Sequence, residues 1–204
     1  KLMTALVALD VSPGADAPVR IEPSDHRPGA VPHIATGEEV TFTDLLNLSL
    51  VASSNVSAAA LARSTGLAAE EFVVQMNAKA RQIGMTGASF VEPTGLDPGN
   101  VASATDVARL LRRALEDERI RDAVMRSDYA FSAKTGRPHH VRSTDALLGS
   151  FLDAPPYVFL GGKTGYLDEA GYCFGAAAQN GDGNRIIAVV LGAKTRDDRF
   201  NDVK

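Results

Sequence analysis

The chain opens with an apolar stretch over residues 1–9 that contains neither Gly nor Pro and predicts the remainder of a buried helix. From 11 to 39 this pattern breaks, because five prolines and three glycines predict loops and short strands. A leucine-rich helix is expected next, with Thr43 or Asp44 at its N-cap. Its apolar residues are Leu45, Leu46, Leu48 and Leu50.

Three further stretches carry apolar residues at helical spacing. An Ala-rich helix is expected over 57–63, with Gly66 beyond its end. A longer amphipathic helix is expected over 69–83. Thr105 is expected to cap another amphipathic helix, with a charged helical continuation over 116–126.

The pattern then changes to one typical of strands. Tyr129 and Phe131 alternate with small or polar residues, and further strands are predicted at 157–160, 172–178 and 185–192. Residues 181–184, between the last two, predict a hairpin turn. A helical middle followed by an antiparallel C-terminal sheet indicates an α+β fold.

Composition narrows the function classes. The 204 residues, of which 45% are hydrophobic and 23% charged, suit a globular chain with one sizeable core. With 21 basic and 25 acidic residues the net charge is −4, which argues against a nucleic-acid surface. No apolar run reaches the roughly 20 residues of a membrane span. The four histidines show no metal-ligand spacing, so neither a metal nor another cofactor is expected.

The strongest chemical motif is Gly-Gly-Lys-Thr-Gly-Tyr at 161–166. Lys163 supplies a positive charge and Thr164 a hydroxyl donor, which together suit an anionic substrate group. Gly165 has no Cβ and lets the substrate approach the backbone, and the amide of Tyr166 could donate to a developing oxyanion. We therefore expect a substrate-binding strand edge here.

The same Lys-Thr-Gly triplet occurs a second time, at 134–136. Pro138 follows it and removes a ladder donor, so this segment suits at most an edge strand. The functional copy is therefore expected at 163–165.

Two further groups complete the candidate site. Ser53 and Asn55 lie two apart at a break between helices, where both side chains can face one cleft; caps also favour Ser and Asn, so this signal is weak alone. Lys1 opens the first helix. A Ser three positions earlier would share its helical face, and burial near other cations could lower the pKa of Lys1 enough for it to act as a base.

These segments resemble the D-Ala-D-Ala carboxypeptidase family of low-molecular-mass penicillin-binding proteins. The Lys-Thr-Gly motif is shared by that group and the serine β-lactamases. The resemblance covers essentially the whole chain, in the same order. It includes Gly37-Glu38-Glu39, residues 76–80, Gly84-Met85-Thr86, residues 90–97, Leu147-Leu148, Gly171-Tyr172 and residues 192–199.

The resemblance implies an α+β, β-lactamase/transpeptidase-like fold, in which helices flank an antiparallel sheet and a helical cluster is inserted. Residues 1–204 would form a single penicillin-binding domain that is incomplete at both ends, with the first strands of the sheet preceding Lys1. The expected location is the periplasm or the extracellular side of the cell envelope, and membrane attachment would use a segment outside this chain.

The implied activity is that of a serine-type D-alanyl-D-alanine carboxypeptidase, which releases terminal D-Ala from peptidoglycan stem peptides and is inhibited by β-lactam antibiotics. A Ser three residues before Lys1 would be the acylated nucleophile, with Lys1 as its base. Ser53 would shuttle a proton, and Asn55 would hold the substrate amide. Lys163, Thr164 and Arg199 would bind the terminal carboxylate.

Four positions depart from the family's pattern. Val56 stands where an acidic residue is usual, and Glu92 stands where Asn commonly precedes Pro-Thr-Gly-Leu. Ser143 and Asp145 replace the two Asn residues ahead of the paired leucines. These changes leave a non-catalytic peptidoglycan-binding or regulatory relative as an alternative. A β-lactamase is a weaker one, because the chain contains no Glu-x-x-Leu-Asn segment.

Overall fold

The computed structural model describes residues 1–12, 14–27 and 31–204. Pro13 and residues 28–30 belong to the predicted loop segment over 11–39 and lie outside the described residues. The elements are, in chain order, α1 (Leu2–Asp10), β1 (Pro18–Arg20), η1 (Pro23–Asp25), β2 (Glu39–Thr41), α2 (Phe42–Val51), α3 (Asn55–Arg63), α4 (Ala69–Gln82), α5 (Ala104–Ala114), α6 (Glu118–Val124), β3 (Asp128–Ser132), β4 (Pro138–Arg142), η2 (Phe151–Asp153), β5 (Val158–Leu167), β6 (Gly171–Gln179), β7 (Arg185–Ala193) and α7 (Asp198–Asn201).

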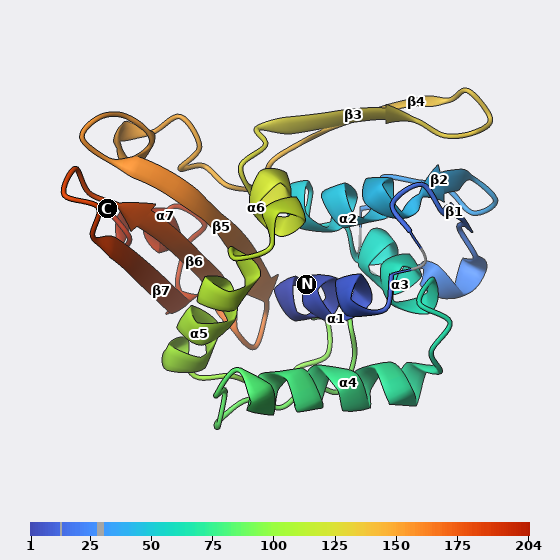
Figure 1. Cartoon of the computed structure of the whole chain (residues 1–204), viewed down its shortest axis with the longest axis horizontal. Coiled ribbons are helices and arrows are strands. Elements are labelled where there is room, and N and C mark those ends of the chain that lie inside the picture. The colour runs from blue at the N-terminus through green and yellow to red at the C-terminus, as the bar shows by residue number, and fades with distance from the viewer. Residues whose placement is uncertain (13, 28–30) are drawn as a thin grey trace.

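The architecture confirms the expected α+β class. Strands β5, β6 and β7 form an antiparallel sheet at one end of the molecule, and a helical cluster occupies the other (Figure 1). Helix α1 lies between the two parts, and the β3–β4 hairpin extends over α2. None of the described helices has both the length and the apolar character needed to cross a membrane.

Helices cover both faces of the three-stranded sheet. Phe174 of β6 packs against Phe200 of α7, with ring centroids 4.9 Å apart. The next residue, Gly175, faces Leu111 of α5, because successive strand residues point to opposite faces. The sheet is therefore sandwiched between α5 and α7.

Helix α1 is central because it is apolar on all sides. Every residue from Leu2 to Leu9 is buried, and α1 packs against α3, α4 and α5. A helix without a polar face is stable only when neighbours surround it. The prediction of a buried helix over 1–9 is confirmed, and this helix holds Lys1 in a defined place.

Two predicted N-caps are wrong: Thr43 or Asp44 at α2, and Thr105 at α5. Thr41 caps α2, because its hydroxyl accepts from the Asp44 amide while the Asp44 carboxylate accepts from the Thr41 amide. Ser103 and Asp106 form the same capping box at α5, so Thr105 lies inside that helix. In a capping box the acidic residue is the third of the helix, which moves the helix start toward the N-terminus.

Two predicted boundaries also change. The continuation over 116–126 is wrong, because α5 ends at Ala114 and α6 is a separate helix capped by Asp117. Strand β5 runs through the Lys-Thr-Gly motif, well past the predicted end at 160. The hairpin turn between β6 and β7 is confirmed.

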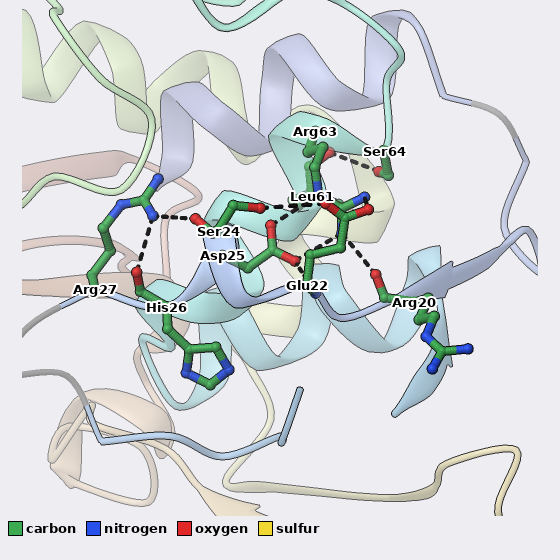
Figure 2. A network of polar contacts seen from close by, with 9 residues as sticks. All are labelled: Arg20, Glu22, Ser24, Asp25, His26, Arg27, Leu61, Arg63 and Ser64. Carbon is green, nitrogen blue, oxygen red and sulfur yellow. Dashed lines mark hydrogen bonds and ion pairs between the residues drawn. The ribbon is translucent and has the colours of Figure 1, made fainter. Parts of the chain in front are cut away.

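An ion-pair network links the β1–η1 segment to the end of α3 (Figure 2). The guanidinium of Arg63 donates to both carboxylate oxygens of the buried Asp25, at 3.0 and 2.7 Å. It also donates to Glu22 and to the Arg20 carbonyl, at 3.0 and 2.7 Å. This planar, multidentate arrangement ties together segments about 40 residues apart in sequence.

Candidate active site

Helix α1 presents Lys1 to a cavity of about 340 Å³. The Lys1 ammonium donates to the carbonyl of Thr94 at 2.8 Å. One turn further along the helix, the hydroxyl of Thr4 donates to the Pro93 carbonyl at 2.5 Å. The start of α1 is therefore held by the loop that follows Phe90.

The break between α2 and α3 directs Ser53 and Asn55 into the same cavity. Ser53 has a φ of 56°, a left-handed conformation that is uncommon for residues other than glycine. The intervening Ser54 is buried and caps α3 by accepting from the Ser57 amide at 3.2 Å. The serine motif thus divides into one capping residue and two that face the cavity.

Strand β5 carries Lys163, Thr164, Gly165 and Tyr166 along the opposite wall. The Thr164 hydroxyl lies 2.6 Å from that of Thr144, which fixes its rotamer. Gly165 is solvent-accessible, so a ligand can reach its backbone directly.

Arg199 reaches this wall from α7 and is nearly buried, with 5% of its surface exposed. One terminal nitrogen of Arg199 donates to the Gly165 carbonyl at 3.1 Å. The guanidinium carbon lies 5.5 and 4.8 Å from the ring centroids of Tyr172 and Phe200. These contacts hold the guanidinium rigidly beside the motif.

All eight residues predicted for the site line this single cavity: Lys1, Ser53, Asn55, Lys163, Thr164, Gly165, Tyr166 and Arg199. The second Lys-Thr-Gly copy instead forms the β3–β4 turn, where Lys134 pairs with Glu39. The structure therefore brings the eight predicted residues together, while their catalytic and binding roles remain predictions.

Cations dominate the electrostatics of the cavity, because Lys1, Lys163, Arg196 and Arg199 all line it. Burial lowers the pKa of Lys1 to about 8, although the Glu92 carboxylate opposes this shift. Burial, and then the charge of Lys1, lowers the pKa of Lys163 well below its usual range, against the pull of Asp145. Burial also lowers the pKa of Arg199. A cavity with this balance favours an anionic ligand.

Asp145 lies behind β5 and is the acidic counterpart of these cations. Its carboxylate is buried, and burial raises its pKa to about 6 against the opposing charges of Lys163 and Arg199. One oxygen accepts from the Leu147 amide at 2.8 Å. The other has no hydrogen-bond partner among the residues that the structure describes.

Sequence reasoning missed several cavity residues. Thr144 and Arg196 line the cavity together with residues 94–96 of the loop. Thr144 lies between Ser143 and Asp145, two positions that depart from the family's pattern, and this could have indicated it from the sequence. Arg196 had no such signal. Within the described ranges, no cluster of three or more His, Cys, Asp or Glu side chains is placed to hold a metal ion.

Comparison with known proteins places this geometry in a family. The model of the family described as D-alanyl-D-alanine carboxypeptidase matches residues 1–195. The chain is 31% identical to the D-alanyl-D-alanine carboxypeptidase DacF of Bacillus subtilis over 98% of its own length and 51% of that protein. It is 32% identical to the D-alanyl-D-alanine endopeptidase of Escherichia coli over 85% of its length and 56% of that protein. The chain thus spans about half the length of these curated relatives.

Solved structures agree on the fold. The Streptomyces K15 DD-transpeptidase superposes with a TM-score of 0.85 at 26% identity, covering 99% of this chain and 82% of that one. The D-alanyl-D-alanine carboxypeptidase of Mycobacterium tuberculosis gives a TM-score of 0.82 at 27% identity, covering 98% and 78%.

Proposed function

The chain belongs to the D-alanyl-D-alanine carboxypeptidase family, and we propose that it supplies most of the active site of a serine-type enzyme that removes terminal D-Ala from peptidoglycan stem peptides. The observation that carries this proposal is the convergence of Lys1, Ser53, Asn55 and the 163–166 strand on one cationic cavity. A stem peptide ends in a carboxylate, which is the anionic group that such a cavity favours.

Lys1 acts as the general base in this proposal. The family's pattern puts the acylated Ser three residues before Lys1, on the same helical face. A lysine works as a base only when it is neutral, and burial has already brought the pKa of Lys1 to about 8. A substantial neutral fraction is therefore present near physiological pH.

Ser53 and Asn55 occupy the wall between Lys1 and β5. The strained backbone of Ser53 aims its hydroxyl at the cavity, where it can relay a proton to the leaving amine. The buried side-chain oxygen of Asn55 accepts no hydrogen bond from any residue that the structure describes, so it is free to accept from a substrate amide.

The terminal carboxylate is recognised by Lys163, Thr164 and Arg199. Arg199 uses one terminal nitrogen on the Gly165 carbonyl and keeps further donors, which suits a two-oxygen anion. The Tyr166 amide then donates to the oxyanion that develops on the attacked carbonyl.

The proposal extends to domain, partners and location. Residues 1–204 form one penicillin-binding domain, and β-lactam antibiotics acylate the same nucleophile as the peptide. The protein acts on peptidoglycan in the cell envelope, on its periplasmic or extracellular side. Any membrane attachment lies outside these residues.

The deciding experiment uses a polypeptide extended to include the segment before Lys1. It is incubated with a fluorescent penicillin, and D-Ala release from a peptide ending in D-Ala-D-Ala is measured. We expect covalent labelling and D-Ala release, both slowed about 10²–10⁴-fold by Lys1→Ala. Lys134→Ala, which removes the lysine of the turn copy, is the matched control and should behave like the parent.

Other outcomes point to the alternative functions. Binding of peptidoglycan without labelling or D-Ala release would favour a non-catalytic relative, for which the changes at Val56, Ser143 and Asp145 are the motivating observation. Rapid turnover of the penicillin without D-Ala release would indicate a β-lactamase. Equal labelling of Lys1→Ala and the parent would remove Lys1 from the mechanism.

A further inference from the structure

Glu92, which replaces a common Asn, is the centre of the loop over 92–100. Its carboxylate is partly buried and accepts hydrogen bonds from five other residues of that loop. They are the Thr94 amide and hydroxyl at 2.6 and 2.5 Å, the Gly95 amide at 2.5 Å, the Leu96 amide at 2.9 Å, the Asp97 amide at 3.4 Å and the Asn100 side-chain amide at 2.7 Å. These donors hold the pKa of Glu92 below its usual range despite its burial.

Two peptide units connect this carboxylate to α1. The amide of Gly95 points at Glu92, and the carbonyl of the same peptide unit, that of Thr94, accepts from the Lys1 ammonium at 2.8 Å. The amide of Thr94 also points at Glu92, and the carbonyl of that unit, on Pro93, accepts from Thr4 at 2.5 Å. In a trans peptide the N–H and C=O point in opposite directions, so fixing one fixes the other.

The arrangement also couples charge across the peptide. A carboxylate on the N–H side polarises the unit and makes its carbonyl oxygen a stronger acceptor for an ammonium. The charged groups around Lys1 are Glu92 from this loop, Lys163 from β5, and Arg196 and Arg199 from the chain after β7. Glu92 is the carboxylate whose charge favours the protonated form of Lys1.

We propose that Glu92 is the positioning residue of Lys1: its carboxylate orients the 93–94 and 94–95 peptide units so that their carbonyls hold the Lys1 ammonium and the first turn of α1. The charge of the same carboxylate opposes the effect of burial and favours the protonated amine. This role rests on the proposed function only in that Lys1 serves there as the base. The Asn of the family's pattern can accept fewer of these donors and carries no charge. We therefore expect Lys1 to be held more firmly, and to be more basic, with Glu92 than with Asn at this position.

The test compares Glu92→Gln with Asp97→Asn in the extended polypeptide. Glu92→Gln keeps the length of the side chain but removes the charge and turns one acceptor into a donor facing backbone amides. Asp97→Asn removes a carboxylate of the same loop that accepts from the Gly99 amide, so it is the matched control. The first readout is the titration of the Lys1 side-chain ammonium, followed by NMR in lysine-labelled protein.

The Lys1 midpoint should fall by about one pH unit or more in Glu92→Gln and stay in place in Asp97→Asn. The second readout is the pH profile of acylation by penicillin. Its rising limb should move to lower pH by the same amount, while the plateau rate falls about ten- to a hundredfold because the amine is held less accurately.

An unchanged Lys1 midpoint in folded Glu92→Gln would overturn the proposal, as would an equal shift in Asp97→Asn. If Glu92→Gln does not fold, Glu92→Asn takes its place with the same expected shift. Failure of the parent to be acylated would reject the proposed function instead, and the NMR titration would still decide the link between Glu92 and Lys1.

Discussion

Two polar clusters of this molecule contain similar charged side chains, but these side chains are paired in one cluster and largely of one sign in the other. Around Arg63, the guanidinium meets the carboxylates of Asp25 and Glu22 and a backbone carbonyl, so each of these three charged groups has an oppositely charged partner (Figure 2). The cavity is instead lined by four cations, Lys1, Lys163, Arg196 and Arg199. In it or directly behind β5, three buried polar atoms lack partners among the described residues: the side-chain oxygen of Asn55, one oxygen of Asp145 and the Nε of Arg199. Two further such atoms, on His26 and Ser49, lie elsewhere.

The two clusters therefore differ in how their charges are compensated. A buried polar group without a partner costs free energy, so proteins seldom keep one unless a ligand or a reaction uses it. Perturbed pKa values gather in the same places, and here Lys1, Lys163 and Asp145 all have them. The Arg63 cluster pairs its charges internally, whereas the cations of the cavity favour an anionic ligand.

The largest expected effect comes from removing the central cation of the cavity. Lys163→Ala should reduce penicillin acylation at least about a hundredfold, because it deletes a preorganised charge at the reacting strand. Lys134→Ala deletes the exposed lysine of the same triplet in the β3–β4 turn and should leave acylation unchanged. The rates of fluorescent labelling measure both, and a reversed result would mean that the turn copy is the functional one.

A change in the Arg63 cluster should instead lower the stability of the protein. Arg63→Ala leaves the buried Asp25 carboxylate without its ion-pair partner, and we expect a loss of about 3 kcal/mol in the free energy of unfolding. Urea unfolding measures this loss, while acylation of the folded fraction should stay within about twofold of the parent. Impaired acylation at unchanged stability would contradict the division between the two clusters.

Asp145, behind β5, tests whether the protein keeps an unfavourably buried carboxylate next to the cations of the cavity. Its folded pKa of about 6 lies above the ordinary value, so the stability that the protonated acid provides is lost as the pH rises through about 4 to 6. Asp145→Asn removes this dependence. The variant should be more stable than the parent by about 2–3 kcal/mol at pH 7, with no difference near pH 3.5.

Equilibrium unfolding at both pH values measures the effect of Asp145→Asn. A constant stability difference across this range would show that packing, and not ionisation, distinguishes the two side chains.

The smallest expected effect concerns recognition of the substrate terminus. Arg199→Ala should lower kcat/KM for a peptide with a free terminal carboxylate about ten- to a hundredfold. An amidated peptide should lose much less, so the preference for the free acid should largely disappear. If the preference survives, Lys163 and Thr164 recognise the carboxylate without Arg199.

Most helices and strands could be predicted from the sequence because their signals, apolar periodicity and turn residues, lie within or next to the element itself. Helix α4 follows from its apolar periodicity, and the β6–β7 hairpin from its Gly-rich turn. The misplaced caps at Thr43 and Thr105 have the same origin: a threonine inside the first turn resembles a cap as much as the residue before it. The end of β5 was missed because the glycines of its motif lower strand propensity, while pairing with β6 overrides that weakness.

The sequence by itself determined the chemistry available to this protein: the triplet with its flanking glycines, the Ser-x-Asn break and the lysine that opens an apolar helix. Pro138 already favoured the copy at 163–165 over the one at 134–136, although the two triplets themselves have the same local chemistry. Only the tertiary structure puts one copy in a turn and the other opposite Lys1. It also decided which donors surround Glu92, because these depend on the path of the loop, and it decided the pKa values of Lys1 and Lys163. Those values arise from burial and from charges that lie far apart in sequence.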